Sequence, residues 1–258
     1  MKMNKLAVAA LAALSATAAW AVQGTIKTDS VTKRGVIRWQ RGSKTYAVTF
    51  KNGQVETKLE FPKDAVRELK IDKPASFDKL AALVNEGKGA SAIAGLTQIV
   101  NEYKMLQWDK EAGRHLVKAY LAANNAQKAY DVAKGIIDDD SSSAWSGELA
   151  PAYWEALLKL GQITKLESCL SKAAASADRR TSAAALVARG DVILASGGDQ
   201  QATYRKALTD AYLRVVLMYR DEACKDVRAQ AISKAADCLD KLGLSVRAES
   251  LRAEGRGL

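Results

Sequence analysis

The sequence predicts an α+β protein in which a small β unit precedes a longer all-helical unit. Two observations predict this division. Apolar and polar residues alternate over about fifty residues after position 22, whereas from Pro74 onward apolar residues recur at helical spacing. In addition, only three prolines occur in 258 residues, which favours helix because proline removes a backbone donor. The expected parts are a signal peptide (1–21), a basic β domain (22–74) and a helical domain (75–258).

The first part has the features of a secretory signal peptide. Lys2 and Lys5 form a basic start, and an apolar run covers Leu6–Ala19. As a helix this run would reach about 21 Å, which is shorter than the hydrocarbon core of a membrane. Ala19-Trp20-Ala21 then matches the small-x-small cleavage pattern, so the mature chain is expected to start at Val22. We therefore expect an exported protein, periplasmic or secreted; the alternative is an uncleaved anchor helix.

Export affects how the three cysteines are interpreted, because an oxidising compartment permits disulfides. Cys224 and Cys238 lie 14 positions apart, which on one straight helix is about 21 Å and beyond disulfide reach. They could pair only if the helix turned between them. A bond from Cys169 to either partner stays open, and so does the simpler alternative of three buried thiols.

Five short strands are expected in the β domain: 24–27, 35–39, 45–50, 55–61 and 66–71. Asn52-Gly53 separates the third from the fourth and suits a tight hairpin turn. This rhythm predicts a small antiparallel barrel or a strongly coiled sheet. It resembles the SH3-like and Sm-like small barrels, with residues 61–66 as the bend before the last strand.

The basic character of the chain is concentrated in this β domain. Residues 22–74 hold 12 basic and 6 acidic side chains, whereas residues 75–258 hold 25 and 23. A polyanion or partner site is expected at Arg34, Arg38, Arg41 and Lys44, of which Arg34 and Arg38 share one face of a strand. A cell-envelope polymer, lipid headgroups or an acidic protein would fit these charges; export argues against nucleic acid. The alternative is a solvated surface that keeps the domain soluble.

The helical domain is expected to consist of helical hairpins. Ser76 is the expected N-cap of its first helix. Expected turns lie at 87–89, 124–125, 161, 197–198 and 242–243, where Gly or Asn interrupts the apolar stripes.

The same offsets recur in two of these hairpins. Tyr120, Ala129 and Ile136 are nine and seven positions apart, and so are Ile193, Ala202 and Thr209. This spacing resembles that of tetratricopeptide (TPR) repeats, in which a large, a small and a further residue meet where two helices cross. The resemblance implies a degenerate TPR-like array over about 76–258 that binds a protein or peptide. An irregular helical bundle is the alternative.

The search for catalytic chemistry yields little. His115 is the one histidine, and no motif gives it a catalytic partner. Residues 138–143 are acidic, but an EF-hand loop starting at Asp138 would need glycine at Ser143 and glutamate at Leu149. We therefore expect no enzyme, no catalytic residue, no metal and no cofactor. The favoured function is an exported scaffold or adaptor. The alternatives are envelope-polymer binding by the β domain and an enzyme whose site only the fold assembles.

Overall fold

The computed structural model describes residues 22–53 and 55–257. The predicted signal peptide (1–21) lies outside the described residues. Backbone contacts divide the chain into two compact units that meet between Asp72 and Lys73. Each unit is described by itself.

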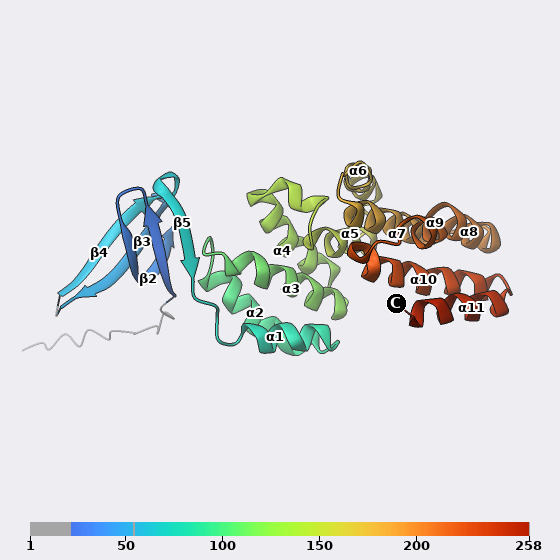
Figure 1. Cartoon of the computed structure of the whole chain (residues 1–258), viewed down its shortest axis with the longest axis horizontal. Helices are drawn as coiled ribbons and strands as arrows, with labels where there is room; N and C mark the ends of the chain where they lie inside the picture. Colours follow the sequence, from blue (N-terminus) through green and yellow to red (C-terminus); the bar gives the residue numbers. More distant parts are fainter. Residues whose placement is uncertain (1–21, 54, 258) are drawn as a thin grey trace, which may run out of the picture. The chain divides into compact units, whose positions relative to one another are not determined.

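The first unit is a five-stranded antiparallel sheet (Figure 1). Its strands are β1 (Gln23–Thr28), β2 (Thr32–Gln40), β3 (Thr45–Asn52), β4 (Val55–Pro62) and β5 (Val66–Ile71). The order across the sheet is β4-β3-β2-β1-β5. The expected bend before the last strand is a 3-10 turn, η1 (Lys63–Ala65). The predicted strand rhythm and antiparallel pairing are therefore confirmed.

The sheet is not closed, so the closed barrel among the expected architectures is wrong and the coiled sheet is right. β4 pairs with β3, and β5 pairs with β1 from Gly24↔Ile71 to Thr28↔Val66. No pairing between β4 and β5 is recorded among the described residues. A sheet closes into a barrel only if the tilt and the register of all its strands match around the whole ring. The alternation of apolar and polar residues along one strand specifies neither of them.

The core of the sheet takes buried side chains from three neighbouring strands, β1, β2 and β3. Ile26, Ile37 and Val48 are fully buried. Gly35 lies close to the point where β2 changes its partner from β1 to β3. A Cβ at Gly35 would lie 2.3 Å from the Thr49 carbonyl oxygen, so only glycine permits this close approach.

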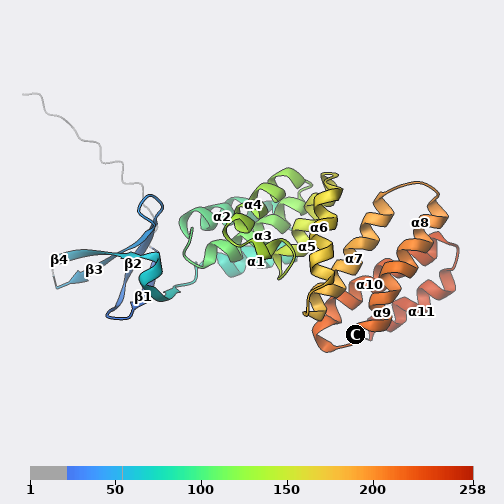
Figure 2. The same ribbon diagram turned by 90° about the horizontal axis from the view of Figure 1, so that it is seen from above.

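The second unit is helical (Figures 1 and 2). Its main helices are α1 (Phe77–Asn85), α2 (Gly89–Glu102), α3 (Trp108–Ala122), α4 (Ala126–Asp139), α5 (Leu149–Lys159), α6 (Ile163–Ala174), α7 (Arg179–Ala195), α8 (Gln200–Ala207), α9 (Leu213–Met218), α10 (Lys225–Lys241) and α11 (Ser245–Arg256). Short turns join some of them: η2 (Ser141–Ala144), the π-helical η3 (Leu208–Tyr212) between α8 and α9, and η4 (Glu222–Cys224). The first helix begins directly after Ser76, as expected, although the serine side chain makes no capping hydrogen bond.

The helices form a stacked array of hairpins. Each helix contacts the next along most of the unit, and alternate helices also touch, in the pairs α1·α3, α3·α5, α5·α7 and α7·α10. These contacts define an inner row, which we name by its members α1, α3, α5, α7 and α10. The predicted hairpin array is therefore confirmed.

Three buried clusters follow one another along this array. The first joins α1 to α3, the second α3 to α7, and the third α7 to α11. Neighbouring clusters share a helix: Tyr120 of α3 packs against the first and second, and Ala184 of α7 against the second and third. This nearest-neighbour organisation is typical of helical repeat proteins.

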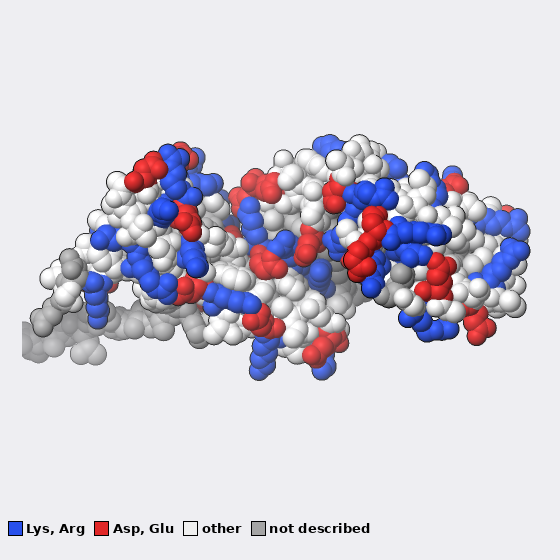
Figure 3. Space-filling view, in the orientation of Figure 1, with Lys and Arg blue, Asp and Glu red and all other residues white. Residues whose placement is uncertain are grey.

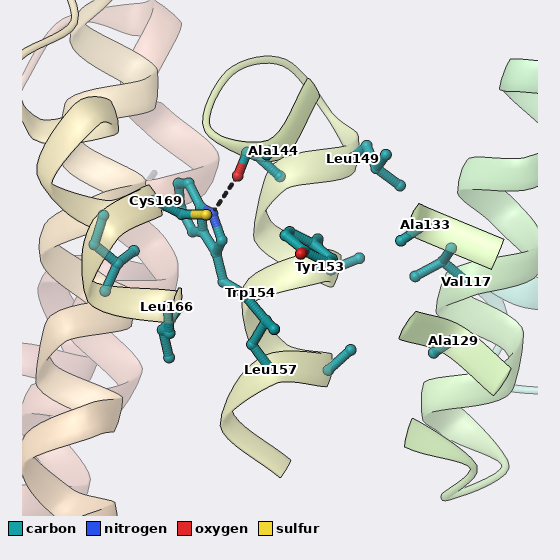
Figure 4. Packing of buried hydrophobic residues seen from close by; sticks show 14 of the residues in the cluster. Val117, Ala129, Ala133, Ala144, Leu149, Tyr153, Trp154, Leu157, Leu166 and Cys169 are labelled. Carbon is teal, nitrogen blue, oxygen red and sulfur yellow. Dashed lines mark hydrogen bonds between the residues drawn. The ribbon is translucent and has the colours of Figure 1, made fainter. Parts of the chain in front are cut away.

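The middle cluster shows how a loop is fixed to the array. Trp154 of α5 is buried, and its indole nitrogen donates a hydrogen bond of 2.9 Å to the Ala144 carbonyl at the end of η2 (Figure 4). Cys169 and Leu166 of α6 lie beside the indole. Since a buried indole N–H needs an acceptor, this bond sets the path of the acidic break that follows α4.

All three cysteines are free and buried. Helix α10 runs uninterrupted from Lys225 to Lys241, so Cys224 and Cys238 stand at one end and near the other of a single helix. They therefore cannot pair with each other. Within residues 22–53 and 55–257, none of the helices combines the length and hydropathy that a membrane span requires.

Candidate functional site

A groove of about 1100 Å³ runs across the inner row of the helical unit. Helices α3, α5, α7 and α10 line it, with Leu166 of α6 as a further contact. Each helix presents one face at a spacing of three or four residues. On α7, for example, the lining residues are Arg180, Ala184, Val187, Ala188 and Asp191. One face from each of four stacked helices is what builds the groove.

The floor of the groove is apolar and its margins are charged. The floor is made by Leu121, Ala122, Pro151, Ala152, Leu158, Ala184, Val187, Ala188 and Val227. Many of these side chains are small, so the groove has room for the bulkier side chains of a bound chain. The margins carry Lys118, Glu148, Glu155, Lys159, Arg180, Asp191, Asp226 and Lys234. Four of these eight are basic and four are acidic, and Figure 3 shows such mixing of charge where α5, α7 and α10 meet.

Two ion pairs join α7 to α10, one toward each end of α7. Near its start, Arg180 pairs with Asp226 at 2.5 Å. Near its end, Asp191 accepts a hydrogen bond of 2.7 Å from Lys234. On α5, Lys159 pairs with Glu155 at 3.2 Å. Six of the eight charged lining residues are therefore neutralised within the groove wall.

Asp191 also accepts a hydrogen bond from the buried core of the helical unit. The Tyr212 hydroxyl donates to the same carboxylate oxygen at 2.7 Å. Tyr212 is fully buried at the end of the π-helical turn η3, and its ring lies against Gly190. Burial, and secondarily the Asp191 charge, raise the pKa of this phenol, so it stays a proton donor. π-helical turns often occur at functional sites.

His115 of α3 stands close to the groove but does not line it. Its ring meets Phe77 edge-on at a centroid distance of 5.5 Å. Burial lowers the pKa of the imidazole, and the neighbouring Lys118 adds to the effect. The Nδ1 atom is buried with no hydrogen-bond partner recorded among the described residues. The ring packs against Phe77, and its Nε2 atom lies 3.8 Å from a carboxylate oxygen of Glu111 one turn earlier on α3, which is beyond hydrogen-bond distance.

The four basic residues predicted in the β unit are spread out. Arg34 and Arg38 are exposed on β2, and Arg34 is paired with Asp72. Arg41 and Lys44 lie in the turn between β2 and β3. At about 3.3 Å per residue, Arg34 stands more than 20 Å along the strand from Arg41. Arg34 is therefore neutralised and remote from the turn.

The turn itself has a further basic neighbour that the sequence did not indicate. The Lys63 backbone N–H donates to the Lys44 carbonyl at 3.2 Å, which brings η1 against this turn. Within the described part of the chain, no ion pair is recorded for Arg38, Arg41, Lys44 or Lys63. Lys63 lies opposite Lys44 because it is the next position in the register of the β3–β4 hairpin, in which Thr45 pairs with Pro62.

The acidic stretch at 138–143 ends helix α4 and leads into the 3-10 turn η2, of which Asp140 is the N-cap. Asp140 accepts hydrogen bonds from the Ser142 backbone and hydroxyl, and Asp138 pairs with Lys134. Across residues 22–53 and 55–257, no group of three or more His, Cys, Asp or Glu side chains is placed to hold a metal ion.

The fold and the groove define a class: a stacked array of helical hairpins with a charged, apolar-floored groove, in a chain whose first unit is a small coiled sheet. Two solved structures are similar to this chain, both of nearly identical TPR-like repeats ascribed to a putative kinesin light chain of Podosopora anserina, one of them carrying a single substitution. Each is 14% identical and covers 71% of this chain and 92% of its own, with TM-scores of 0.45 and 0.44. At this level no residue role is carried over. Neither a family model nor a curated protein matches the sequence.

Proposed function

We propose that this protein is a non-catalytic scaffold whose helical unit binds a segment of a partner protein in the groove. The observation that supports this function is the apolar floor between charged margins, built by one face from each of four helices. A bound chain would bury apolar side chains against the floor, which is the main favourable term in association. The volume exceeds the range of most small-molecule pockets.

We further propose that the protein acts after export, with residues 1–21 removed and Val22 as the mature N-terminus. The basic start, the short apolar run and the small-x-small pattern support this. N-terminal sequencing of the protein recovered from the cell envelope tests it. A chain that still begins at Met1 would overturn it.

The scaffold proposal is tested by crosslinking and co-purification of the exported protein from intact envelopes. Ala122 and Gln230 line the groove at positions that are not buried, so Ala122→Trp and Gln230→Trp fill it without disturbing the core. Ala202 on α8 is outside the buried core and does not line the groove, so Ala202→Trp is the matched control. We expect the same partner with wild type and Ala202→Trp, and its loss with both groove variants. A partner retained by the groove variants would contradict the proposal.

A second candidate function is binding of an anionic envelope polymer by the β unit. The observation in its favour is the set of exposed cations Arg38, Arg41, Lys44 and Lys63, for which no ion pair is recorded within the described residues. Binding of this kind weakens as salt rises because exposed charges are screened. Replacing Arg38, Arg41, Lys44 and Lys63 by glutamine should reduce retention on envelope fractions at low salt. Equal retention of variant and wild type would exclude this function.

A further inference from the structure

The groove has two charged residues that its own wall leaves unneutralised. They are Lys118 of α3 and Glu148, which immediately precedes α5. No ion pair or side-chain hydrogen bond is recorded for either of them within the described residues, and Glu148 makes no capping bond to its own helix. The other six lining charges are paired with one another.

Both residues lie in the half of the groove formed by α3 and α5. Lys118 lines the groove from α3, and Glu148 lines it just before the start of α5. Between α7 and α10, by contrast, the ion pairs Arg180–Asp226 and Lys234–Asp191 are already formed. A charged group of a ligand that binds between α7 and α10 must compete with an existing ion pair. A charged group that binds at Lys118 or Glu148 has no recorded ion pair to displace.

The size of the groove limits the ligand. A helix about 10 Å wide that rises 1.5 Å per residue occupies about 120 Å³ per residue. The volume of about 1100 Å³ is several times that of one helical residue, so the groove can hold a segment of several residues and not a single side chain alone.

From these observations we infer that the partner segment is several residues long and bipolar, with one acidic side chain for Lys118, one basic side chain for Glu148, and apolar side chains for the floor over α7. The inference rests on the proposed function. The two charges also fix the direction in which the segment lies, because reversing it would place like charges together.

The experiment selects ligands from a displayed library of random peptides somewhat longer than the groove. The targets are wild type, Lys118→Glu, Glu148→Lys and the double variant. The double variant Lys110→Glu/Glu249→Lys is the control, because these exposed residues are not groove-lining and the net charge is unchanged. We expect peptides that carry an acid and a base at a fixed separation, that bind the control like wild type, and that bind each single groove variant about tenfold more weakly or worse. Lys118→Glu/Glu148→Lys should select peptides with the two charges exchanged.

Two outcomes distinguish a failure of the bipolar ligand from a failure of the proposed groove binding. Peptides that lose binding to Ala122→Trp and Gln230→Trp but ignore the charge reversals would overturn the bipolar ligand and leave the groove function standing. Peptides that bind both tryptophan variants like wild type, or no enrichment at all, would overturn the groove function and the inference with it.

Discussion

The Tyr212 hydroxyl and the Asp191 carboxylate are joined by a hydrogen bond of 2.7 Å that ties the groove wall to a buried turn of helix. Lys234 reaches the same oxygen from α10 at 2.7 Å. A buried phenol therefore holds a groove-lining carboxylate in place, and that carboxylate in turn holds a groove-lining lysine. The position of this wall is set from inside the core.

Removing the hydroxyl should destabilise the protein measurably. We expect Tyr212→Phe to lower the free energy of unfolding by about 1.5 kcal/mol, because hydrogen bonds to charged groups contribute about 1.5 to 3 kcal/mol. Denaturant titration followed by circular dichroism measures this. Tyr204→Phe is the control, since Tyr204 is half-buried in the same cluster and no hydrogen bond of its hydroxyl is recorded among the described residues. Equal losses in the two variants would contradict the prediction.

Two glycines in helices should respond to alanine in opposite directions. A Cβ at Gly190 would lie 2.4 Å from the Tyr212 ring, so Gly190→Ala should cost about 1 to 3 kcal/mol through overpacking. Gly135 of α4 is exposed with nothing near its added Cβ, so Gly135→Ala should stabilise by about 0.5 to 1 kcal/mol. Thermal unfolding of both variants gives the signs. A neutral Gly190→Ala would mean that α7 and η3 pack more loosely than described.

The cap of α7 should make stability depend on pH. Asp178 accepts hydrogen bonds from the Thr181 hydroxyl and backbone N–H, and the hydroxyl first, then the backbone, holds the pKa of Asp178 below its usual range. A depressed folded pKa means that the stabilisation is present above the unfolded pKa, about 3.9, and is lost as pH falls through the lower folded value.

Asp178→Ala should therefore cost about 1 kcal/mol at neutral pH, and the difference from wild type should shrink as pH falls below about 4. Unfolding measured at a series of pH values checks this. Asp178→Asn retains a capping oxygen without the charge and should show little of the pH-dependent part. A constant difference between Asp178→Ala and wild type at every pH would be inconsistent with the assignment.

The three thiols should be inert in the folded protein. Burial raises the pKa of Cys169 and Cys224 and raises that of Cys238 to about 11. Since the thiolate is the reactive form, a colorimetric thiol reagent should titrate almost none of them in native protein and all three in denaturant. The same titration on protein recovered from the envelope should give the same result. Fewer than three thiols in denaturant would reveal a disulfide.

The local patterns in the sequence were enough to predict the strands and most helix boundaries. Asn52-Gly53, Gly161 and Leu242-Gly243 all lie at turns, because their backbone requirements are local. The openness of the sheet was not predictable, since it depends on how far β5 lies from β4. The π-helical turn was not predictable either: apolar residues recur from Tyr204 to Tyr219 as they would on one continuous helix, and nothing in that spacing marks the turn at Leu208–Tyr212.

The groove could not be derived from the sequence, because its floor combines residues of α3, α5, α7 and α10 that lie far apart along the chain. The two ion pairs between α7 and α10 join residues 46 and 43 positions apart, Arg180 with Asp226 and Asp191 with Lys234. Which charges meet depends on the register between stacked helices, and no spacing within one helix encodes it. Lys118 and Glu148 stand out only after the other pairs have been identified.

The sharing of α3 and α7 between neighbouring buried clusters has a consequence for unfolding. No single cooperative unit includes every helix, so the array should open in steps from its ends, and amide exchange should be fastest in α1 and α11 and slowest in the middle. Helix α7 belongs to two clusters and also forms a wall of the groove. A ligand bound there would stabilise both clusters that share α7. Its binding should therefore slow the opening of the helices at the C-terminal end, and amide exchange there should become slower.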